Sequence, residues 1–180
     1  STIKKLYIFW SKNFKFYKKK FNFFVSDERL FVNNKYTNSY NIQNNFLINI
    51  ARFEYKFFKI NSYPKSILDE LNNYSKKIKK IDIAILSLGK DGHLASIFNR
   101  KKRLEKFFFC EVKNRYPFRI SAGINEIKKT KVLIILVVGF KKGKQLKKSL
   151  SNKNSILHSI LSNNNNFFLI DYLAYKGYTC

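Results

Sequence analysis

The sequence has few of the residues on which several classes of protein depend. It contains two cysteines, Cys110 and Cys180, which stand far apart in the chain. Two isolated cysteines provide neither a disulfide framework nor the paired spacing of a zinc site, so a reducing compartment is expected. The longest apolar run, Val132–Val138, is far shorter than the roughly 20 residues that cross a bilayer. Lysines near the N-terminus argue against a signal peptide, and we expect a cytoplasmic protein.

Acidic residues are scarce, with 11 Asp and Glu against 36 Lys and Arg, which gives a formal net charge of +25. An excess of this size would fit a nucleic-acid partner. The charge, however, comes mostly from lysines spread along the whole chain. It accompanies heavy use of Asn, Ile, Phe and Tyr. We interpret this joint bias as drift toward AT-rich codons, which disfavours nucleic acid as the partner.

Apolar runs alternate with amphipathic, lysine-rich stretches along the chain. This alternation predicts an α/β fold with a largely parallel sheet. No repeat or linker indicates a second domain, so residues 1–180 are expected to form a single domain. The asparagine run 163–166 is expected to be a loop. The predicted strands are 21–26, 81–88, 107–112, 118–122, 131–138 and 167–170, and the predicted helices are 38–52, 64–80, 140–150, 154–162 and a tail after residue 171.

The loop after Leu88 carries the strongest candidates for catalysis, because ligands of such sheets bind beyond the carboxyl ends of the strands. Gly89 and Gly92 permit a tight turn and a close approach of backbone N–H groups to a ligand. Asp91 and His93 lie at the end of the strand and, as we interpret the pattern, at the start of a helix. Such a pair can act as a base and its orienting partner. The alternative is an ordinary turn in which the aspartate caps a helix.

Two further loops offer polar side chains at strand ends. Asp27-Glu28-Arg29 follows the first strand, where Arg29 can bind an anion, although a solvated charged turn is the alternative. The run Gly139–Lys144 opens a helix after the most apolar strand, and lysines and free N–H groups there suit a phosphate. It lacks the glycine spacing and the Lys-Ser/Thr pair of a P-loop. A lysine-rich surface remains the alternative for this run.

Taken together, these motifs resemble the 6-phosphogluconolactonase branch of the glucosamine-6-phosphate isomerase superfamily. The family's Asp-Gly-His-x-Ala-Ser-x-Phe matches Asp91–Phe98, and its strand ending in Asp-Glu-Arg matches Phe23–Arg29. Its Pro-x-Arg-Ile-Ser motif matches Pro117–Ser121, and its apolar strand, glycine and lysine match Leu133–Lys142. A closing Asp-x-x-Ala matches Asp171–Ala174. These matches lie in the family's order across nearly the whole chain.

The resemblance implies a Rossmann-like, doubly wound fold and a metal-independent, cofactor-free enzyme of the oxidative pentose phosphate pathway. Its substrate would be the sugar-phosphate lactone 6-phospho-D-glucono-1,5-lactone. His93 would be the general base and Asp91 would orient it. Several residues would bind the substrate, three of them (Arg29, Arg119 and Lys142) by holding its phosphate or the developing negative charge. The implied substrate-binding residues are Ser1, Thr2, Asp27, Arg29, Gly89, Gly92, Arg119 and Lys142.

The resemblance also bears on the start of the chain. The family has an early Ser-Gly-Gly-Ser-Thr-Pro loop that touches the substrate phosphate, and this chain opens Ser1-Thr2. The resemblance therefore implies that the chain begins inside that loop, without the family's first strand and helix.

Other functions remain open at this point. The sister deaminase places a glutamate shortly after the histidine, and the run Ala95–Arg100 has none, which favours the lactonase. Lys90 stands where the family has proline, and Leu94 where it has threonine.

A basic RNA-binding protein could use interleaved aromatic and lysine residues, with a steep dependence of binding on salt. An inactive remnant is the third alternative.

Overall fold

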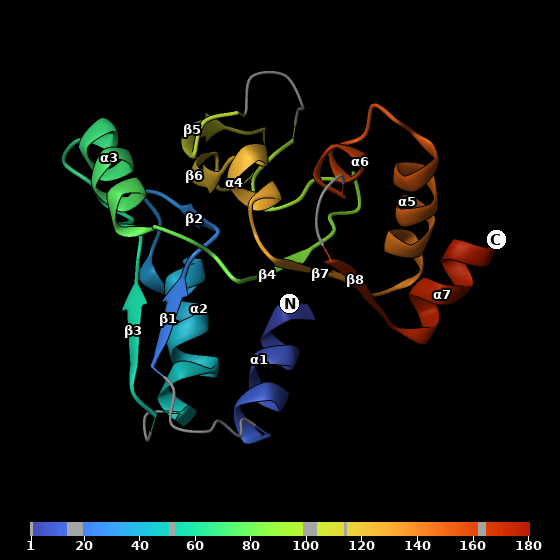
Figure 1. Ribbon diagram of the computed structural model, residues 1–180, viewed down its shortest axis with the longest axis horizontal. Helices are drawn as coiled ribbons and strands as arrows, with labels where there is room; N and C mark the ends of the chain where they lie inside the picture. The colour runs from blue at the N-terminus through green and yellow to red at the C-terminus, as the bar shows by residue number, and fades with distance from the viewer. Residues whose placement is uncertain (1, 14–19, 51–52, 99–103, 114, 162–164) are drawn as a thin grey trace. The chain divides into compact units, whose positions relative to one another are not determined.

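The computed structural model describes residues 2–13, 20–50, 53–98, 104–113, 115–161 and 165–180. The chain divides into two compact units (Figure 1). Unit 1 comprises Ser1–Lys77 and Phe109–Ile120, and unit 2 comprises Ile78–Phe108 and Ser121–Cys180. Both contain helices and parallel strands, so the predicted α/β class is confirmed. A single domain over residues 1–180 stays a prediction.

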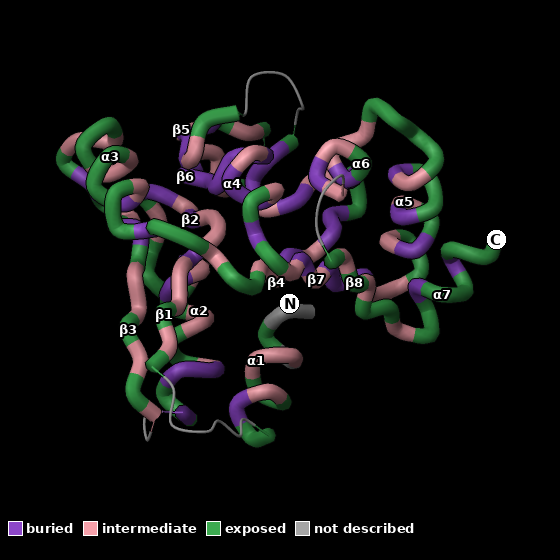
Figure 2. The backbone as a smooth tube through the Cα atoms, in the orientation of Figure 1, coloured by how far each residue is buried: buried purple, intermediate pink, exposed green. Residues whose placement is uncertain are grey.

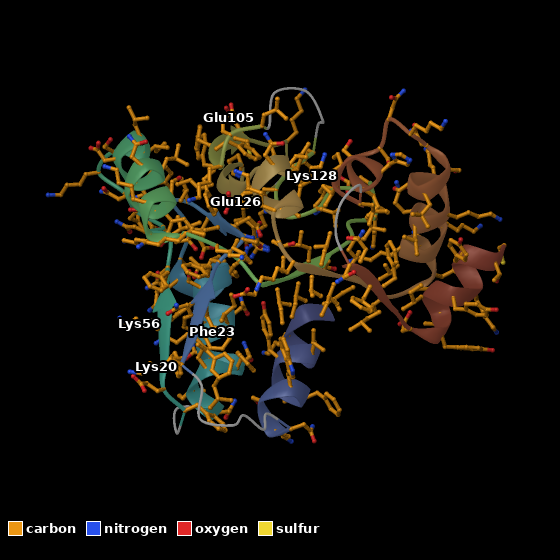
Figure 3. The ribbon with its side chains drawn as sticks, in the orientation of Figure 1. Lys20, Phe23, Lys56, Glu105, Glu126 and Lys128 are labelled. Atoms are coloured by element: carbon orange, nitrogen blue, oxygen red, sulfur yellow. The ribbon has the colours of Figure 1, made fainter. Side chains whose placement is uncertain are left out.

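In unit 1, two parallel strands and several helices enclose an aromatic core. Strand β1 (Phe21–Phe24) pairs with β3 (Tyr55–Phe58), and helices α1 (Thr2–Lys12) and α2 (Asn38–Asn45) belong to the same unit. Phe46, Leu47 and Ile50 are buried where α2 passes into the 3₁₀ helix η2 (Leu47–Ile50). Phe23, labelled in Figure 3, packs from β1 against this cluster, with its ring centroid 5.6 Å from that of Phe46. This aromatic burial stabilises the unit.

A buried tyrosine ties helix α3 (Ile67–Lys77) to the carboxyl end of β1. The hydroxyl of Tyr74 accepts a hydrogen bond from the Val25 N–H at 2.8 Å and donates to the Val25 carbonyl at 2.9 Å. Tyr74 has no exposed surface, and burial raises the pKa of its phenol. The two bonds satisfy backbone groups that β1 no longer pairs, which fixes the point where the chain turns toward Asp27.

A second sheet has the order β2-β6-β5, formed by β2 (Asp27–Arg29), β6 (Phe118–Ala122) and β5 (Phe107–Glu111). Next to the β2–β6 pairing, the Leu30 N–H donates to the Phe118 carbonyl at 2.9 Å. This pairing brings two separate motifs of the sequence, the acid-acid-base triplet and the Pro-x-Arg-Ile-Ser segment, onto neighbouring strands.

Unit 2 is built on three parallel strands in the order β4-β7-β8: β4 (Ile83–Ser87), β7 (Val132–Val137) and β8 (Asn165–Ile170). The central strand, β7, is the most buried of the three (Figure 2), as its unbroken apolar sequence predicts. The helices of this unit are α4 (Ile124–Lys128), α5 (Phe140–Ser151), α6 (Ile156–Ile160) and α7 (Tyr172–Thr179).

Helices α5 and α7 lie side by side (Figure 1) and approach closely through two glycines. A Cβ atom on Gly143 would overlap the backbone of Ala174, and one on Gly177 would overlap the backbone of Phe140. Only glycine permits helix backbones to come this close. The start of α5 is therefore held by contacts over its whole first turn.

The structure corrects several predicted elements. Asp27–Arg29 form strand β2 although a loop was expected there, and strand β3 and helix α4 were not predicted. Asn165 and Asn166 begin β8 although a loop was expected; residues 163–164 lie outside the described ranges. Over the described residues 94–98, no helix follows His93: residues 94–97 form a tight turn closed by a bridge between Leu94 and Ile97. Within the described ranges, no helix is both long and apolar enough to cross a membrane.

Candidate active site

The loop between Leu88 and His93, at the carboxyl end of β4, is closed by its own backbone. The Gly89 N–H donates to the His93 carbonyl at 2.8 Å, and the Gly92 N–H donates to the Gly89 carbonyl at 3.2 Å. Gly92 has φ 91°, a conformation that favours glycine. The tight turn is thus present, and both glycine N–H groups are engaged inside it. The role of Gly89 and Gly92 in binding substrate stays a prediction.

Within this loop, Asp91 and His93 form the expected pair. Asp91 Oδ1 lies 2.5 Å from His93 Nδ1 and also accepts from the His93 N–H at 3.4 Å. Partial burial acts to raise the pKa of the Asp91 carboxyl, but the hydrogen bond and charge of His93 outweigh it and lower this pKa. Asp91 is therefore ionised at neutral pH. It fixes the proton on Nδ1 and leaves Nε2 as the basic nitrogen of the ring.

The position of the imidazole ring is set from two further sides. The ring of Phe98 lies against it, with centroids 4.4 Å apart. A Cβ atom on Gly89 would overlap the ring itself and would lie 2.6 Å from Asp91 Oδ1. The side chain of His93 remains 31% exposed, so water and a ligand can reach it. A held but accessible imidazole is what a general base requires.

Lys142 lies in the first turn of α5, and its Nζ donates to the hydroxyl of Ser87 at 2.9 Å. Burial lowers the pKa of the Lys142 ammonium, and the positive charge of Lys90 lowers it further. Gly139, which precedes α5, has φ 92° and offers no side-chain cap. Both the helix start and the lysine present positive charge at this point.

Asp171 anchors the turn into α5 from the far end of the sequence. Its Oδ1 accepts from the Gly139 N–H at 2.9 Å and from the Ala174 N–H at 2.8 Å, so it caps α7 and holds the β7–α5 turn at once. The family motif Asp171–Ala174 therefore helps to hold the turn before α5, the helix that carries Lys142.

In unit 1, the acid-acid-base triplet is organised around Glu28, a residue that sequence reasoning did not place in the site. Glu28 has no exposed surface. Its carboxylate accepts from the N–H groups of Arg29, Asn38 and Ser39 at 2.8, 2.6 and 2.7 Å. Burial raises the pKa of Glu28, and the hydrogen bonds to Ser39, Asn38 and Arg29 oppose this rise. Glu28 thereby fixes the loop that follows β2.

Arg29 is held on the same loop. Its Nη1 donates to the Tyr36 carbonyl at 2.5 Å, and its guanidinium lies 5.3 Å from the centre of the Tyr116 ring. Its Nε is buried and has no hydrogen-bond partner among the described residues. Part of its donor capacity is therefore already used within unit 1, and its role toward substrate stays a prediction.

Arg119 lies on β6, the neighbour of β2, and is only 9% exposed. Its Nε donates to the Tyr116 carbonyl at 3.2 Å. Burial lowers the pKa of its guanidinium, Asp27 opposes this shift through its negative charge, and Arg29 adds to it. Asp27, Arg29 and Arg119 thus form one charged group in unit 1, and arginine stays protonated in any such setting.

The remaining predicted residues are placed less fully. Ser1 lies outside the described residues, and Thr2 is the first residue of α1, where its side chain is not described. Among the described residues, no three His, Cys, Asp or Glu side chains are gathered where a metal ion could bind.

Comparison with known proteins bears on this arrangement. Residues 1–165 match the family model of glucosamine-6-phosphate isomerases/6-phosphogluconolactonase. A 6-phosphogluconolactonase of Borreliella burgdorferi is 28% identical over 170 residues, which cover 87% of this chain and 72% of the relative. The chain belongs to the glucosamine-6-phosphate isomerase/6-phosphogluconolactonase family, as its motifs predicted.

Solved structures share the fold. The 6-phosphogluconolactonase of Thermotoga maritima superposes with a TM-score of 0.79 at 20% identity, over 93% of this chain and 80% of that one. A monomeric glucosamine-6-phosphate deaminase gives a TM-score of 0.81 at 14% identity, over 97% and 82% of the two chains. Both branches of the family therefore share this architecture, and the fold alone does not choose between them.

Proposed function

We propose that the protein hydrolyses 6-phospho-D-glucono-1,5-lactone to 6-phosphogluconate in the oxidative pentose phosphate pathway, with His93 as the general base. The observation that carries this proposal is the Asp91–His93 pair, with 2.5 Å between Oδ1 and Nδ1, in an accessible loop at the carboxyl end of β4. The Borreliella burgdorferi protein that the chain matches is a 6-phosphogluconolactonase by name. The deaminase alternative is disfavoured because this chain lacks the glutamate that the deaminase motif has shortly after the histidine.

The proposed reaction needs only water and groups of this chain. Nε2 of His93 takes a proton from water while the water oxygen bonds to the lactone carbonyl carbon. The tetrahedral intermediate then collapses, the bond from that carbon to the ring oxygen breaks, and the imidazolium returns the proton to the departing oxygen. Asp91 stabilises the imidazolium and keeps Nε2 directed outward. Water and lactone are consumed, and one hydroxy acid is formed.

Binding of the anionic substrate would fall to cationic side chains. We propose that Lys142 holds the phosphate, and that Arg29 and Arg119 hold the phosphate or the charge that develops on the carbonyl oxygen. Ser1, Thr2, Asp27, Gly89 and Gly92 complete the proposed set of substrate-binding residues.

The test is lactone hydrolysis measured above the spontaneous background. His93→Ala is expected to reduce kcat by about 10²-fold to 10⁴-fold, the usual contribution of a general base. His158→Ala is the matched control, because the only other histidine lies on the surface of α6; its kcat should equal that of the unaltered protein. Glucosamine 6-phosphate should not be deaminated. A folded protein with no hydrolysis above background, or full activity in His93→Ala, would refute the proposal.

A further inference from the structure

Ser87 is the last residue of β4 and lies opposite Leu136 of β7 in the parallel register. Its hydroxyl oxygen accepts from Lys142 Nζ at 2.9 Å, across 55 positions of sequence and within unit 2. No motif of the sequence pointed to this serine. The contact joins the end of a strand to the first turn of a helix, where the ligand sites of α/β sheets lie.

The chemistry of the two groups determines the direction of this hydrogen bond. An ammonium group has donors and no acceptor, so Lys142 must occupy a lone pair of the serine oxygen. The hydroxyl proton of Ser87 is then available, and no acceptor for it is found among the described residues. Two more protons on Lys142 Nζ are available in the same way. Donors from a strand and from a helix therefore converge at this point.

The charge around this pair is unbalanced. In the described part of the chain, no carboxylate lies within ion-pair distance of Lys142. The nearby charge that acts on it is the positive one of Lys90, and the ammonium is half-buried. The start of α5, a helix of 12 residues without a side-chain cap, adds the partial positive charge of its N–H groups. The Asp171 carboxylate at this helix start is bound to the N–H groups of Gly139 and Ala174. An anion is the ligand that these groups favour.

We propose that Ser87 is a specificity-determining residue, which fixes the ammonium of Lys142 and donates its own hydroxyl proton to the phosphate of the substrate. This inference rests on the proposed function for the identity of the phosphorylated ligand. A serine that merely tied α5 to β4 would affect the unfolding free energy but not the preference for a phosphorylated ligand. The two roles are therefore separable by experiment.

The experiment measures the binding of 6-phosphogluconate and of gluconate, by calorimetry, to the unaltered protein and its variants. Ser87→Ala is expected to weaken the binding of 6-phosphogluconate by about tenfold or more, as for the loss of hydrogen bonds to a charged group. Gluconate binding should not change. Ser87→Thr keeps the hydroxyl and should retain most of the affinity. Ser151→Ala is the control, because that exposed serine of α5 bonds only to backbone carbonyls.

In the hydrolysis assay, Ser87→Ala should raise KM for the phosphorylated lactone and leave kcat nearly unchanged. If Ser87→Ala fails to fold, Ser87→Cys carries the same test, because it keeps the shape of the side chain, at a slightly larger volume, with a weaker donor and acceptor. Equal affinity of Ser87→Ala and the unaltered protein for 6-phosphogluconate, or no binding by either, would overturn the inference. Equal losses for gluconate and 6-phosphogluconate would also overturn it.

These outcomes are distinguishable from a failure of the proposed function. Product binding needs no hydrolysis, so binding that depends on Ser87 in a protein without lactonase activity would refute only the proposed reaction. Lactonase activity that depends on His93, in a protein whose phosphate selectivity ignores Ser87, would refute only this inference.

Discussion

At the scale of single residues, the proposed contribution of Asp91 is the tautomer and orientation that it imposes on His93. Asp91→Asn would replace an ionised acceptor with an amide at nearly the same volume. The amide can neither stabilise an imidazolium by charge nor fix the proton on Nδ1 as firmly. We expect kcat to fall by about tenfold or more, and by less than in His93→Ala, while KM changes little.

A matched control for this change exists in the same unit. Asp82 is an exposed carboxylate whose ion pair with Lys131, at 2.7 Å, lies on the surface. Asp82→Asn alters the net charge as Asp91→Asn does, and it should leave kcat unchanged because surface pairs of this kind contribute little. Equal kcat values for Asp91→Asn and the unaltered protein would show that the short contact with His93 has no catalytic role.

The lowered pKa of Lys142 predicts that the affinity of the site for a phosphorylated ligand depends on pH in the alkaline range. Burial, and then the charge of Lys90, lower the pKa of Lys142 below the ordinary lysine value. The affinity for 6-phosphogluconate should therefore decline as pH rises through this lowered pKa. Lys90→Gln removes the neighbouring positive charge and should move the decline to higher pH. A calorimetric titration series over alkaline pH measures both effects, and coinciding profiles for the two proteins would exclude the coupling.

The same pKa shift has a defined sign for stability. In the unfolded chain Lys142 keeps its ordinary pKa. At pH values between the lowered pKa of the folded state and this ordinary pKa, the unfolded state therefore binds more protons than the folded state. The contribution of Lys142 to the unfolding free energy therefore rises with pH in that window and is unfavourable below it. A phosphate bound beside Lys142, as proposed, would offset this cost at neutral pH.

At the scale of elements, the pairing of α5 with α7 determines where Lys142 lies. Helix propensity alone predicts that Gly143→Ala stabilises the protein by about 1 kcal/mol. Packing predicts the opposite, because the added Cβ would lie 2.9 Å from Ala174 Cα and would overlap its carbonyl group. We expect a net loss of about 1–3 kcal/mol in the free energy of unfolding, typical of overpacking.

Urea unfolding followed by circular dichroism measures this loss. Lys144→Ala, at the next and exposed position of α5, is the control and should change stability little. An increase in the free energy of unfolding for Gly143→Ala would mean that α7 is not held against α5 in solution.

The elements that could be predicted from sequence are those with a strong local pattern. β7 is a continuous run of β-branched and aliphatic residues, and α5 follows it after Gly139, so both were predicted within a residue or two. β3 is a strand of four residues among charged neighbours, and α4 is a helix of five residues without a side-chain cap. Elements this short form because tertiary packing stabilises them. Their sequences are too short to show the periodic pattern of apolar residues from which a strand or helix is predicted.

The wrong prediction of a helix after His93 has a similar cause. Ala95 takes a positive φ of 52°, and the N–H of Ser96 is bound by the hydroxyl of Ser121, which lies 25 positions away. No local pattern reveals such a distant partner. The Asp91–His93 pair was predictable because both residues lie in one loop. The Ser87–Lys142 contact depends instead on the pairing of β4 with β7, the strand that precedes α5.

At the scale of the whole molecule, the net charge of +25 would act on the proposed substrate, which carries a phosphate dianion. Whatever the origin of the lysines, their field acts on any anion. An excess of one sign raises the local concentration and the arrival rate of the opposite sign. The same excess repels itself within the folded chain, so salt should affect stability and substrate capture in opposite directions.

The last prediction follows from this long-range field. Raising the ionic strength from about 0.01 M to about 0.15 M shortens the Debye length from about 30 Å to about 8 Å. We expect kcat/KM for the phosphorylated lactone to fall several-fold over this range, mainly through KM, because distant lysines cease to contribute. Unphosphorylated gluconolactone is neutral and serves as the control, so its kcat/KM should change little. Parallel salt dependence for the two lactones would show that salt alters the enzyme itself. A flat profile for both would show that only the groups close to the phosphate attract it.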